Sequence, residues 1–272
     1  MEYAVAQSDS SSIVIEPSQG YVRVGWGELW AARELFYFLA WRDLKTRYAQ
    51  TAIGAGWALL QVVFSYVVKV PSDGVPYPLF VFAAILPWSL FARSLERSTL
   101  SVVTEGGLIK KVYFPRLIIP IAATFINLVD FAVGLLLLIG LMLWYQIVPP
   151  WTLVCLPLFV GVAVVTALSV SLWLSALNVK YRDVASIVPL MTQLWMFASP
   201  VLYPASLVPE PVRVYYGLNP MAGVIEGVRW ALLGKAAPEW GMVAVSLGVV
   251  TILLGGGVMF FRRVERTFAD VI

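Results

Sequence analysis

The chain has 272 residues, of which 60% are hydrophobic and 13% are charged, and its formal net charge is +3. Soluble domains carry about 25% charged residues, so this composition indicates a membrane protein and excludes an ordinary soluble enzyme. The sequence has no histidine and one cysteine, Cys155, which removes the commonest metal ligand and general base and excludes an intrachain disulfide. A chain of this length forms one membrane domain, without room for a separate catalytic domain.

Residues 1–27 are expected to form a cytoplasmic tail in front of the membrane domain, residues 28–272. The tail is polar and has no apolar stretch, so we expect no cleavable signal peptide. Residues 28–50 then place large side chains on one helical stripe, with basic residues between them. This pattern is typical of an amphipathic helix lying in the headgroup plane of the membrane. The stripe consists of Trp30, Tyr37, Trp41, Leu44 and Tyr48.

The rest of the chain predicts an all-α membrane protein with six transmembrane helices. A span needs about 20 apolar residues, because the hydrocarbon core is about 30 Å thick and a helix rises about 1.5 Å per residue. The first predicted span is short, at about 24 Å of helix. Asp130 is the one charged residue of the third span. The six spans cover residues 53–68, 77–95, 117–148, 151–177, 184–203 and 241–261.

Residues 204–240 predict a folded external cap before the last span. Within it, Asn219 is a good helix N-cap, Pro220 suits the first helical position and Gly234 suits the end, which predicts a helix over residues 220–233. Such a helix measures about 21 Å, too short to cross the membrane. We therefore expect a short interfacial or re-entrant helix on the outer side.

The basic residues set the orientation, because cytoplasmic segments of membrane proteins are enriched in Lys and Arg. With both termini in the cytoplasm, four of the 19 Lys and Arg residues lie outside, namely Lys69, Arg213, Arg229 and Lys235. Membrane topology therefore explains the basic charge, and we expect no nucleic-acid partner.

No motif for catalysis or cofactor binding is present in the sequence. It lacks the phosphate-binding patterns GxxxxGKS and GxxxxGKT, and it offers neither a metal-ligand cluster nor a histidine for a nucleophilic serine. The glycines at 255–257 lie inside the sixth span and favour close helix packing. We expect a protein that is not an enzyme and that binds no cofactor or metal itself.

Asp130 is an intramembrane acid, about 21 Å along the helix from Arg116. An acid at such a depth is a candidate functional residue. It could couple proton movement, or it could be a satisfied structural acid facing the bundle or a water-filled path. Asn127, one turn away, is its main neighbour in the sequence.

Residues 93–116 are expected to link the second and third spans on the cytoplasmic side. The segment could be a solvated loop that supplies topology charge. However, Leu108, Ile109, Val112, Tyr113 and Phe114 are apolar for a free loop, and they adjoin basic residues. This combination favours a docking surface for another protein.

Aromatic residues make up 14% of the chain. About half of the tryptophans lie near predicted span ends, where an interfacial belt explains them. Others lie within spans and would be lipid-facing or core residues, or would line a path on which flat rings contact sugar faces. The candidates for such a path are Trp57, Phe64, Trp88, Phe91, Trp195 and Phe197.

Several spaced motifs resemble the membrane permeases of ABC-type polysaccharide exporters, which serve O-antigen, capsule and teichoic acid export. The likeness covers residues 28–272, although the family usually has a fuller first span. The motifs are YFLAWRDLKTRY at 37–48 with IGAGW at 53–57, KVYFPR at 111–116, LNVKYRDV at 177–184, LNPM at 218–221 and FRRVERTFADVI at 261–272.

This resemblance implies a multi-pass homodimer in the bacterial inner membrane with a central channel for lipid-linked polysaccharide. It also implies two copies of a separate ATPase subunit, which bind the ATP and Mg²⁺. Contacts that couple this ATPase to the channel would involve the surface helix and the link after the second span. The residues implied are Arg42, Asp43, Lys45, Arg47, Lys110, Lys111, Tyr113, Phe114 and Arg116.

Two other functions stay open from the residues alone. One is a membrane-embedded enzyme of lipid-linked sugar metabolism, which would need paired carboxylates or a metal site that the sequence does not offer. The other is a proton-coupled secondary transporter that uses Asp130, for which internal repeats are expected and none is visible.

Overall fold

The computed structural model of the chain describes residues 26–48, 74–234 and 237–268, and this part is helical without any strand. The elements in chain order are α1 (Trp26–Ala31), α2 (Arg33–Tyr48), α4 (Tyr77–Thr104), α5 (Gly106–Ile109), α6 (Ile118–Phe125), α7 (Asn127–Trp144), η1 (Trp151–Cys155), α8 (Leu156–Lys180), α9 (Val184–Phe197), η2 (Ala205–Leu207), α10 (Glu210–Tyr216), α11 (Pro220–Leu233) and α12 (Trp240–Glu265).

Within the described ranges, four helical stretches are long and apolar enough to cross a membrane: Tyr77–Thr104, Ile118–Trp144, Trp151–Lys180 and Trp240–Glu265. They correspond to the second, third, fourth and sixth predicted spans. The fifth, predicted over 184–203, is the shorter helix α9 of 14 residues. The first, predicted over 53–68, lies outside the described residues.

α4 is nine residues longer than its predicted span, because it ends at Thr104 and not at residue 95. Polar residues of the additional turns are buried and bonded to helix carbonyls. Ser98 Oγ donates to the Pro120 carbonyl of α6 at 2.6 Å, and Thr99 Oγ1 donates to Leu95 O at 2.7 Å. Arg97 therefore lies on a helix and not in the predicted link, and Arg93, which the predicted span and the predicted link shared, belongs to the helix.

The third predicted span is interrupted at Ile126, between α6 and α7. Side chains at this point compete for backbone carbonyls. Asn127 Nδ2 donates to Ala123 O at 3.0 Å, and Thr124 Oγ1 donates to Pro120 O at 2.9 Å. Such local bonds disturb the regular ladder of a helix.

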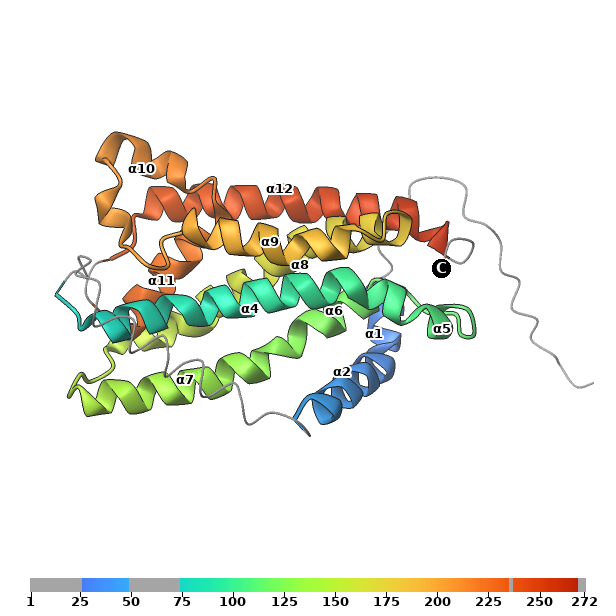
Figure 1. Cartoon of the computed structure of the whole chain (residues 1–272), viewed down its shortest axis with the longest axis horizontal. Coiled ribbons are helices and arrows are strands. Elements are labelled where there is room, and N and C mark those ends of the chain that lie inside the picture. Colours follow the sequence, from blue (N-terminus) through green and yellow to red (C-terminus); the bar gives the residue numbers. More distant parts are fainter. Residues whose placement is uncertain (1–25, 49–73, 235–236, 269–272) are drawn as a thin grey trace, which may run out of the picture.

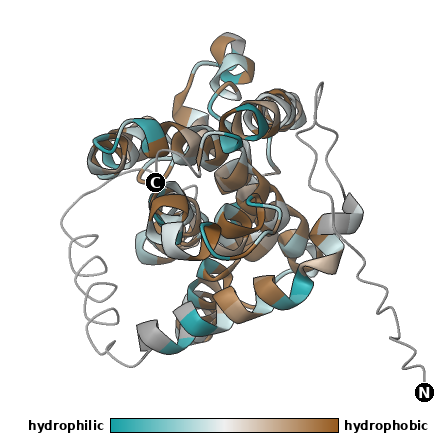
Figure 2. Ribbon diagram, turned by 90° about the vertical axis from the view of Figure 1, so that its right-hand side faces the viewer, coloured by the Kyte–Doolittle hydropathy of each residue, from teal (hydrophilic) through white to brown (hydrophobic). Residues whose placement is uncertain are grey.

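α4 is the centre of the bundle and packs against α6, α7, α8, α9 and α11. Figure 1 shows the long helices running along the longest axis, with α5 and the end of α12 at one extremity and α10 and α11 at the other. We refer to these extremities as the α5 end and the α11 end. Hydrophobic residues, brown in Figure 2, lie on outer helix faces as well as inside, as Leu136 and Ile252 illustrate with 70% and 76% exposure.

α11 confirms the helix predicted over residues 220–233. Asn219 caps it by accepting a hydrogen bond from the Met221 amide at 3.1 Å, and Gly234 ends it with φ of +64°. The helix is nearly all buried and packs against α4, α8 and α12. Glycines permit this close approach, since a Cβ on Gly227 would lie 2.1 Å from the Phe159 ring.

α2 confirms a helix within the predicted range of 28–50 and lies against α6. Leu39 is buried in that contact, and the rings of Phe36 and Phe125 meet edge to face at 5.7 Å. On the other side, Tyr37 and Trp41 are exposed and stack on each other at 6.3 Å. These rings leave a large apolar surface away from the bundle, as an interfacial helix requires.

Candidate functional site

An exposed basic surface follows α5 at one extremity of the bundle. Lys110 and Lys111 are exposed, and the Tyr113 ring is 81% exposed. Phe114 was expected to contribute to the same docking surface. It is instead buried, at 8% exposure, and belongs to one hydrophobic cluster with Leu39 and Phe261. Lys110, Lys111 and Tyr113, here called the α5 surface, are therefore available to a partner, whereas Phe114 holds the segment against the bundle.

Arg116 joins the same segment to the end of α12. Its Nη1 donates to the Glu265 carbonyl, its backbone amide donates to Glu265 Oε1 at 3.2 Å, and its guanidinium lies 5.9 Å from the Phe268 ring centre. The Phe268 ring in turn contacts Phe261 edge to face at 5.3 Å. Arg116 thus has a structural role that its position in a basic motif did not reveal.

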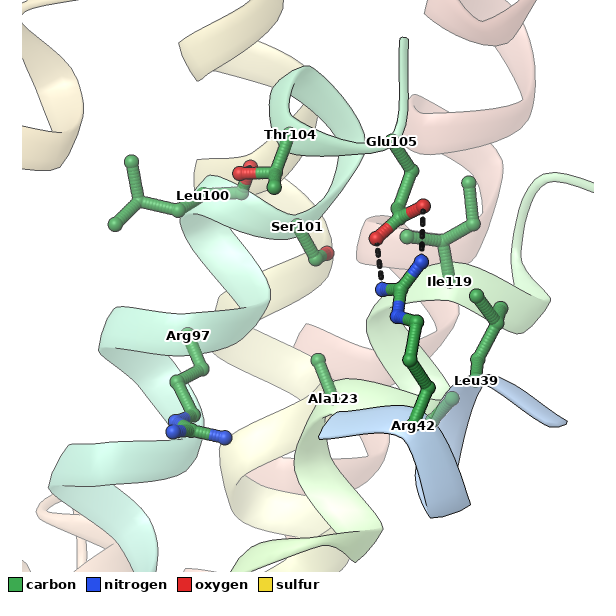
Figure 3. Close-up of a pocket in the computed structure, with 10 residues that line it drawn as sticks. Leu39, Arg42, Arg97, Leu100, Ser101, Thr104, Glu105, Ile119 and Ala123 are labelled. Atoms are coloured by element: carbon green, nitrogen blue, oxygen red, sulfur yellow. Dashed lines mark hydrogen bonds and ion pairs between the residues drawn. The ribbon is translucent and has the colours of Figure 1, made fainter. Parts of the chain in front are cut away.

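Arg42 connects α2 to the end of α4. Two of its guanidinium nitrogens donate to the two carboxylate oxygens of Glu105, with Nη1 to Oε2 at 3.2 Å (Figure 3). A paired, bidentate contact of this kind fixes the orientation of both side chains. Of the other predicted α2 residues, Lys45 is exposed, while the side chains of Asp43 and Arg47 lie outside the described part.

Asp130 forms an ion pair with Arg93 that joins α7 to α4. Its Oδ2 lies 3.1 Å from Nη1 of Arg93, and the two side chains are 19% and 51% exposed. Asn127, its predicted neighbour, donates to Ser94 Oγ at 3.2 Å. Sequence reasoning missed Arg93 as the partner because it assigned that residue to the cytoplasmic end of the second span and to the link that follows.

The predicted channel aromatics fall into two groups. Trp88 and Phe91 are buried at 5% and 0% exposure, and Phe91 contacts Trp195 edge to face at 5.1 Å. Phe197 is 57% exposed. Trp57 and Phe64 lie outside the described residues. Phe197 is therefore an exposed ring in this structure, whereas Trp88 and Phe91 are packing residues.

Asn219 joins the end of α9 to the start of α11. Its Oδ1 accepts from Trp195 Nε1 at 3.0 Å, and its Nδ2 donates to Ala198 O at 3.1 Å. The Tyr216 hydroxyl also donates to Ala198 O, at 2.9 Å, and meets the Tyr203 hydroxyl at 2.9 Å. Burial, together with the hydrogen bond to Tyr203, raises the pKa of Tyr216 above that of an ordinary tyrosine.

Arg229 of α11 is buried at 5% exposure and was not expected from the sequence to have a role in the bundle. Its Nη1 lies 2.9 Å from Glu226 Oε1, its Nη2 donates to Val201 O at 2.7 Å, and its guanidinium lies 3.6 Å from the Phe80 ring centre. The available signal was Glu226 three residues before Arg229, a charged pair in an otherwise apolar helix. This pair ties α11 to α4 and to the turn after α9.

No group of three or more acidic, histidine or cysteine side chains that could hold a metal occurs in the described part of the chain. The polar groups brought together are instead ion pairs between helices and an exposed basic surface.

Comparison with known proteins decides the class. The family of the ABC-2 type transporter matches residues 34–233, which run from α2 to the end of α11. The chain belongs to the ABC-2 type transporter membrane family. This confirms the resemblance drawn from the spaced motifs.

Relatives of this ABC-2 family member are named as transport proteins. The "O-antigen export system permease protein RfbA" of Myxococcus xanthus is 30% identical over 90% of this chain and 98% of its own length. A protein of the same name from Klebsiella pneumoniae is 25% identical over 88% of this chain and 95% of its own length. The "Polysialic acid transport protein KpsM" of Escherichia coli is 21% identical, with coverages of 79% and 88%.

Proposed function

We propose that this chain is the membrane-spanning permease subunit of an ABC transporter that exports lipid-linked, O-antigen-like polysaccharide across the bacterial inner membrane. The similarity to an O-antigen export permease over 98% of that protein's length is the observation that carries the proposal. A polysialic acid transport protein among the relatives supports a polysaccharide as the substrate class.

A separate ATPase subunit supplies the energy and binds the ATP and Mg²⁺, since this sequence has no phosphate-binding motif. The α5 surface supports a docking role, because exposed lysines beside a tyrosine suit an acidic partner with an apolar patch. In this proposal, the α5 end faces the cytoplasm, as do both termini.

Two permease chains form a homodimer around the polysaccharide, each with one ATPase. Exposed apolar residues of α9 support a contact with a second chain or a path at this helix. Their exposures are 52% for Ile187, 59% for Leu190, 62% for Leu194 and 57% for Phe197.

The test is ATP-dependent transfer of lipid-linked polysaccharide in everted membrane vesicles. The chain is co-expressed with a candidate ATPase subunit, and substrate labelled on the cytoplasmic face is followed into the vesicle lumen. Transfer should require both chains and should stop with an ATPase variant that cannot hydrolyse ATP. Formation of the complex without any ATP-dependent transfer, or ATP hydrolysis by this chain alone, would contradict the proposal.

The same vesicles discriminate the two other functions. An enzyme of lipid-linked sugar metabolism would alter the mass of the labelled lipid, whereas a permease leaves it unchanged. A secondary transporter would move substrate when a proton gradient is imposed without ATP. The intramembrane Asp130 is the observation that keeps this last alternative testable.

A further inference from the structure

A cavity of about 440 Å³ lies between α2, α4 and α6 at the α5 end of the bundle. Small side chains leave this space open, since Ala122 and Ala123 of α6 face it together with Ile119. Its volume is within the range of sites that hold small ligands, roughly 300–1,000 Å³. The cavity can therefore accept a headgroup and the first part of an attached chain.

The described lining of the cavity has one positive charge in excess. Among the described residues, three charged ones line it, and two of them, Arg42 and Glu105, neutralise each other as a bidentate pair. The third is Arg97 of α4, which is half-buried, and in Figure 3 its guanidinium lies apart from the Arg42–Glu105 pair. Among the described residues, no hydrogen bond or ion pair reaches this guanidinium.

The hydrogen-bond donors that line the cavity favour an anionic ligand, which supplies acceptor oxygens. Ser101 and Thr104 also line the cavity, but their hydroxyls donate to the carbonyls of Ser98 and Leu100 at 2.8 and 3.1 Å. Arg97 is thus the principal donor, and a guanidinium matches the oxygens of a phosphate in a bidentate manner.

The apolar part of the wall indicates where this phosphate comes from. Leu39, Leu100 and Ile119 line the cavity, and Leu100 is 47% exposed at its margin. The neighbouring face of α2 exposes Tyr37 and Trp41, rings that prefer the headgroup level of a bilayer. A charged donor beside an apolar wall at this level suits an amphiphile better than a free phosphate ion.

We infer that this cavity binds the phosphate headgroup of a membrane lipid, with Arg97 as the phosphate-binding residue and the α2–α4–α6 wall in contact with its acyl chain. Such binding links the interfacial helix to the bundle, and it does not depend on the proposed transport activity.

The test measures lipid retained by the purified full-length chain in native mass spectrometry. The probes are phosphatidylglycerol, diacylglycerol with the same acyl chains, a polyprenyl pyrophosphate and inorganic phosphate. Phosphatidylglycerol should bind and diacylglycerol should not, and Arg97→Gln should weaken the binding about tenfold, the value of one charge-assisted hydrogen bond. Ala123→Leu, which fills the cavity without changing its charge, should also weaken the binding of phosphatidylglycerol.

Arg263→Gln is the matched control, because it removes an exposed arginine at the same extremity of the bundle, outside the cavity lining. Competition between phosphatidylglycerol and the polyprenyl pyrophosphate assigns the site to a bilayer lipid or to a polyprenyl carrier. Either result supports a lipid-phosphate site. The inference is overturned if Arg97→Gln binds phosphatidylglycerol like the unmodified chain, if it loses no more than Arg263→Gln does, or if inorganic phosphate competes as well as the lipids. Arg97→Lys should recover part of the binding. Such recovery would show that Arg97→Gln binds weakly because it lacks the positive charge and not because it is misfolded.

Discussion

Arg93 of α4 and Asp130 of α7 form an ion pair, with 3.1 Å between Nη1 and Oδ2. Counted along α4, Arg93 lies about 24 Å from the Tyr77 end and about 16 Å from the Thr104 end. The pair therefore lies well inside the length of a spanning helix, where charged residues occur in pairs or face water. It joins α7 to α4, the central helix of the bundle.

Asp130→Asn should lower the stability of the protein by about 1 kcal/mol, because Arg93 loses its countercharge while remaining half exposed. Thermal unfolding in detergent measures this loss. The double variant Arg93→Gln with Asp130→Asn should recover part of it. Export per folded subunit should continue in the single variant without dependence on a proton gradient. Export that stops in a fully folded Asp130→Asn protein would favour proton coupling.

Arg229→Met should destabilise the protein by about 3 kcal/mol or more, because Glu226 would remain in a nearly buried position without its partner. The variant would also lose the guanidinium that joins α11 to the Phe80 ring and to the Val201 carbonyl. Arg182→Met removes an exposed arginine and serves as the control. Equal unfolding temperatures for the two variants would show that the buried pair does not hold α11 in place.

Reversing the charge at Lys110 and Lys111 should weaken the complex with the ATPase roughly tenfold at low salt, because exposed charges act mainly through screened attraction. Affinity measured against ionic strength should converge with that of the unmodified chain at high salt. Arg116→Glu should behave differently, since Arg116 bonds Glu265 inside the protein, and should lower the unfolding temperature of the isolated chain. A salt-independent affinity for the lysine variants would exclude the α5 surface as the docking site.

Phe91→Ala and Phe197→Ala form a matched pair, since the same side chain is removed from a buried and an exposed position. Phe91 is fully buried, so its loss should cost about 3–5 kcal/mol of stability. Phe197 is 57% exposed, and its loss should leave the unfolding temperature unchanged. Polysaccharide export should fall in the Phe197 variant if its ring contacts the substrate path. Unchanged export would remove Phe197 from that path.

Cysteine labelling in intact cells tests the orientation. In a chain with Cys155→Ser, an impermeant reagent should react with Leu207→Cys and Glu210→Cys near the α11 end, because both positions are exposed. It should not react with Lys180→Cys or Thr267→Cys, which lie at the α5 end. The reverse pattern would overturn the assignment drawn from the basic residues.

The sequence predicts those parts of this fold that depend on local chemistry. The helix at 220–233 is correct at both ends because Asn219 and Gly234 are capping residues with direct backbone roles. Four of the six predicted spans correspond to long apolar helices of the structure, yet the end of α4 was placed too early. Its extra turns contain serines and threonines that look like a loop in the sequence but are bonded to helix carbonyls in the fold.

Burial could not be read from the sequence. In a membrane, residues that face lipid and residues that face protein are equally apolar, so Phe91 and Phe197 look alike in composition. For the same reason, Phe114 and Tyr113 are neighbours in one motif with opposite surroundings. Contacts between distant segments, such as those of Arg93 with Asp130 and Arg116 with Glu265, require the packing of the helices to be known.

α4 has 28 residues, and it makes polar contacts with other helices near its start, in its middle and directly after its end. Near one end, the Phe80 carbonyl accepts a hydrogen bond from Arg229. Farther along, Arg93 meets Asp130, and directly after the last turn Glu105 meets Arg42. One inserted or deleted residue rotates everything beyond it by about 100°, so these contacts could not all survive. α4 can therefore tolerate many side-chain substitutions, whereas an insertion or deletion within it would separate at least one of these three contact pairs.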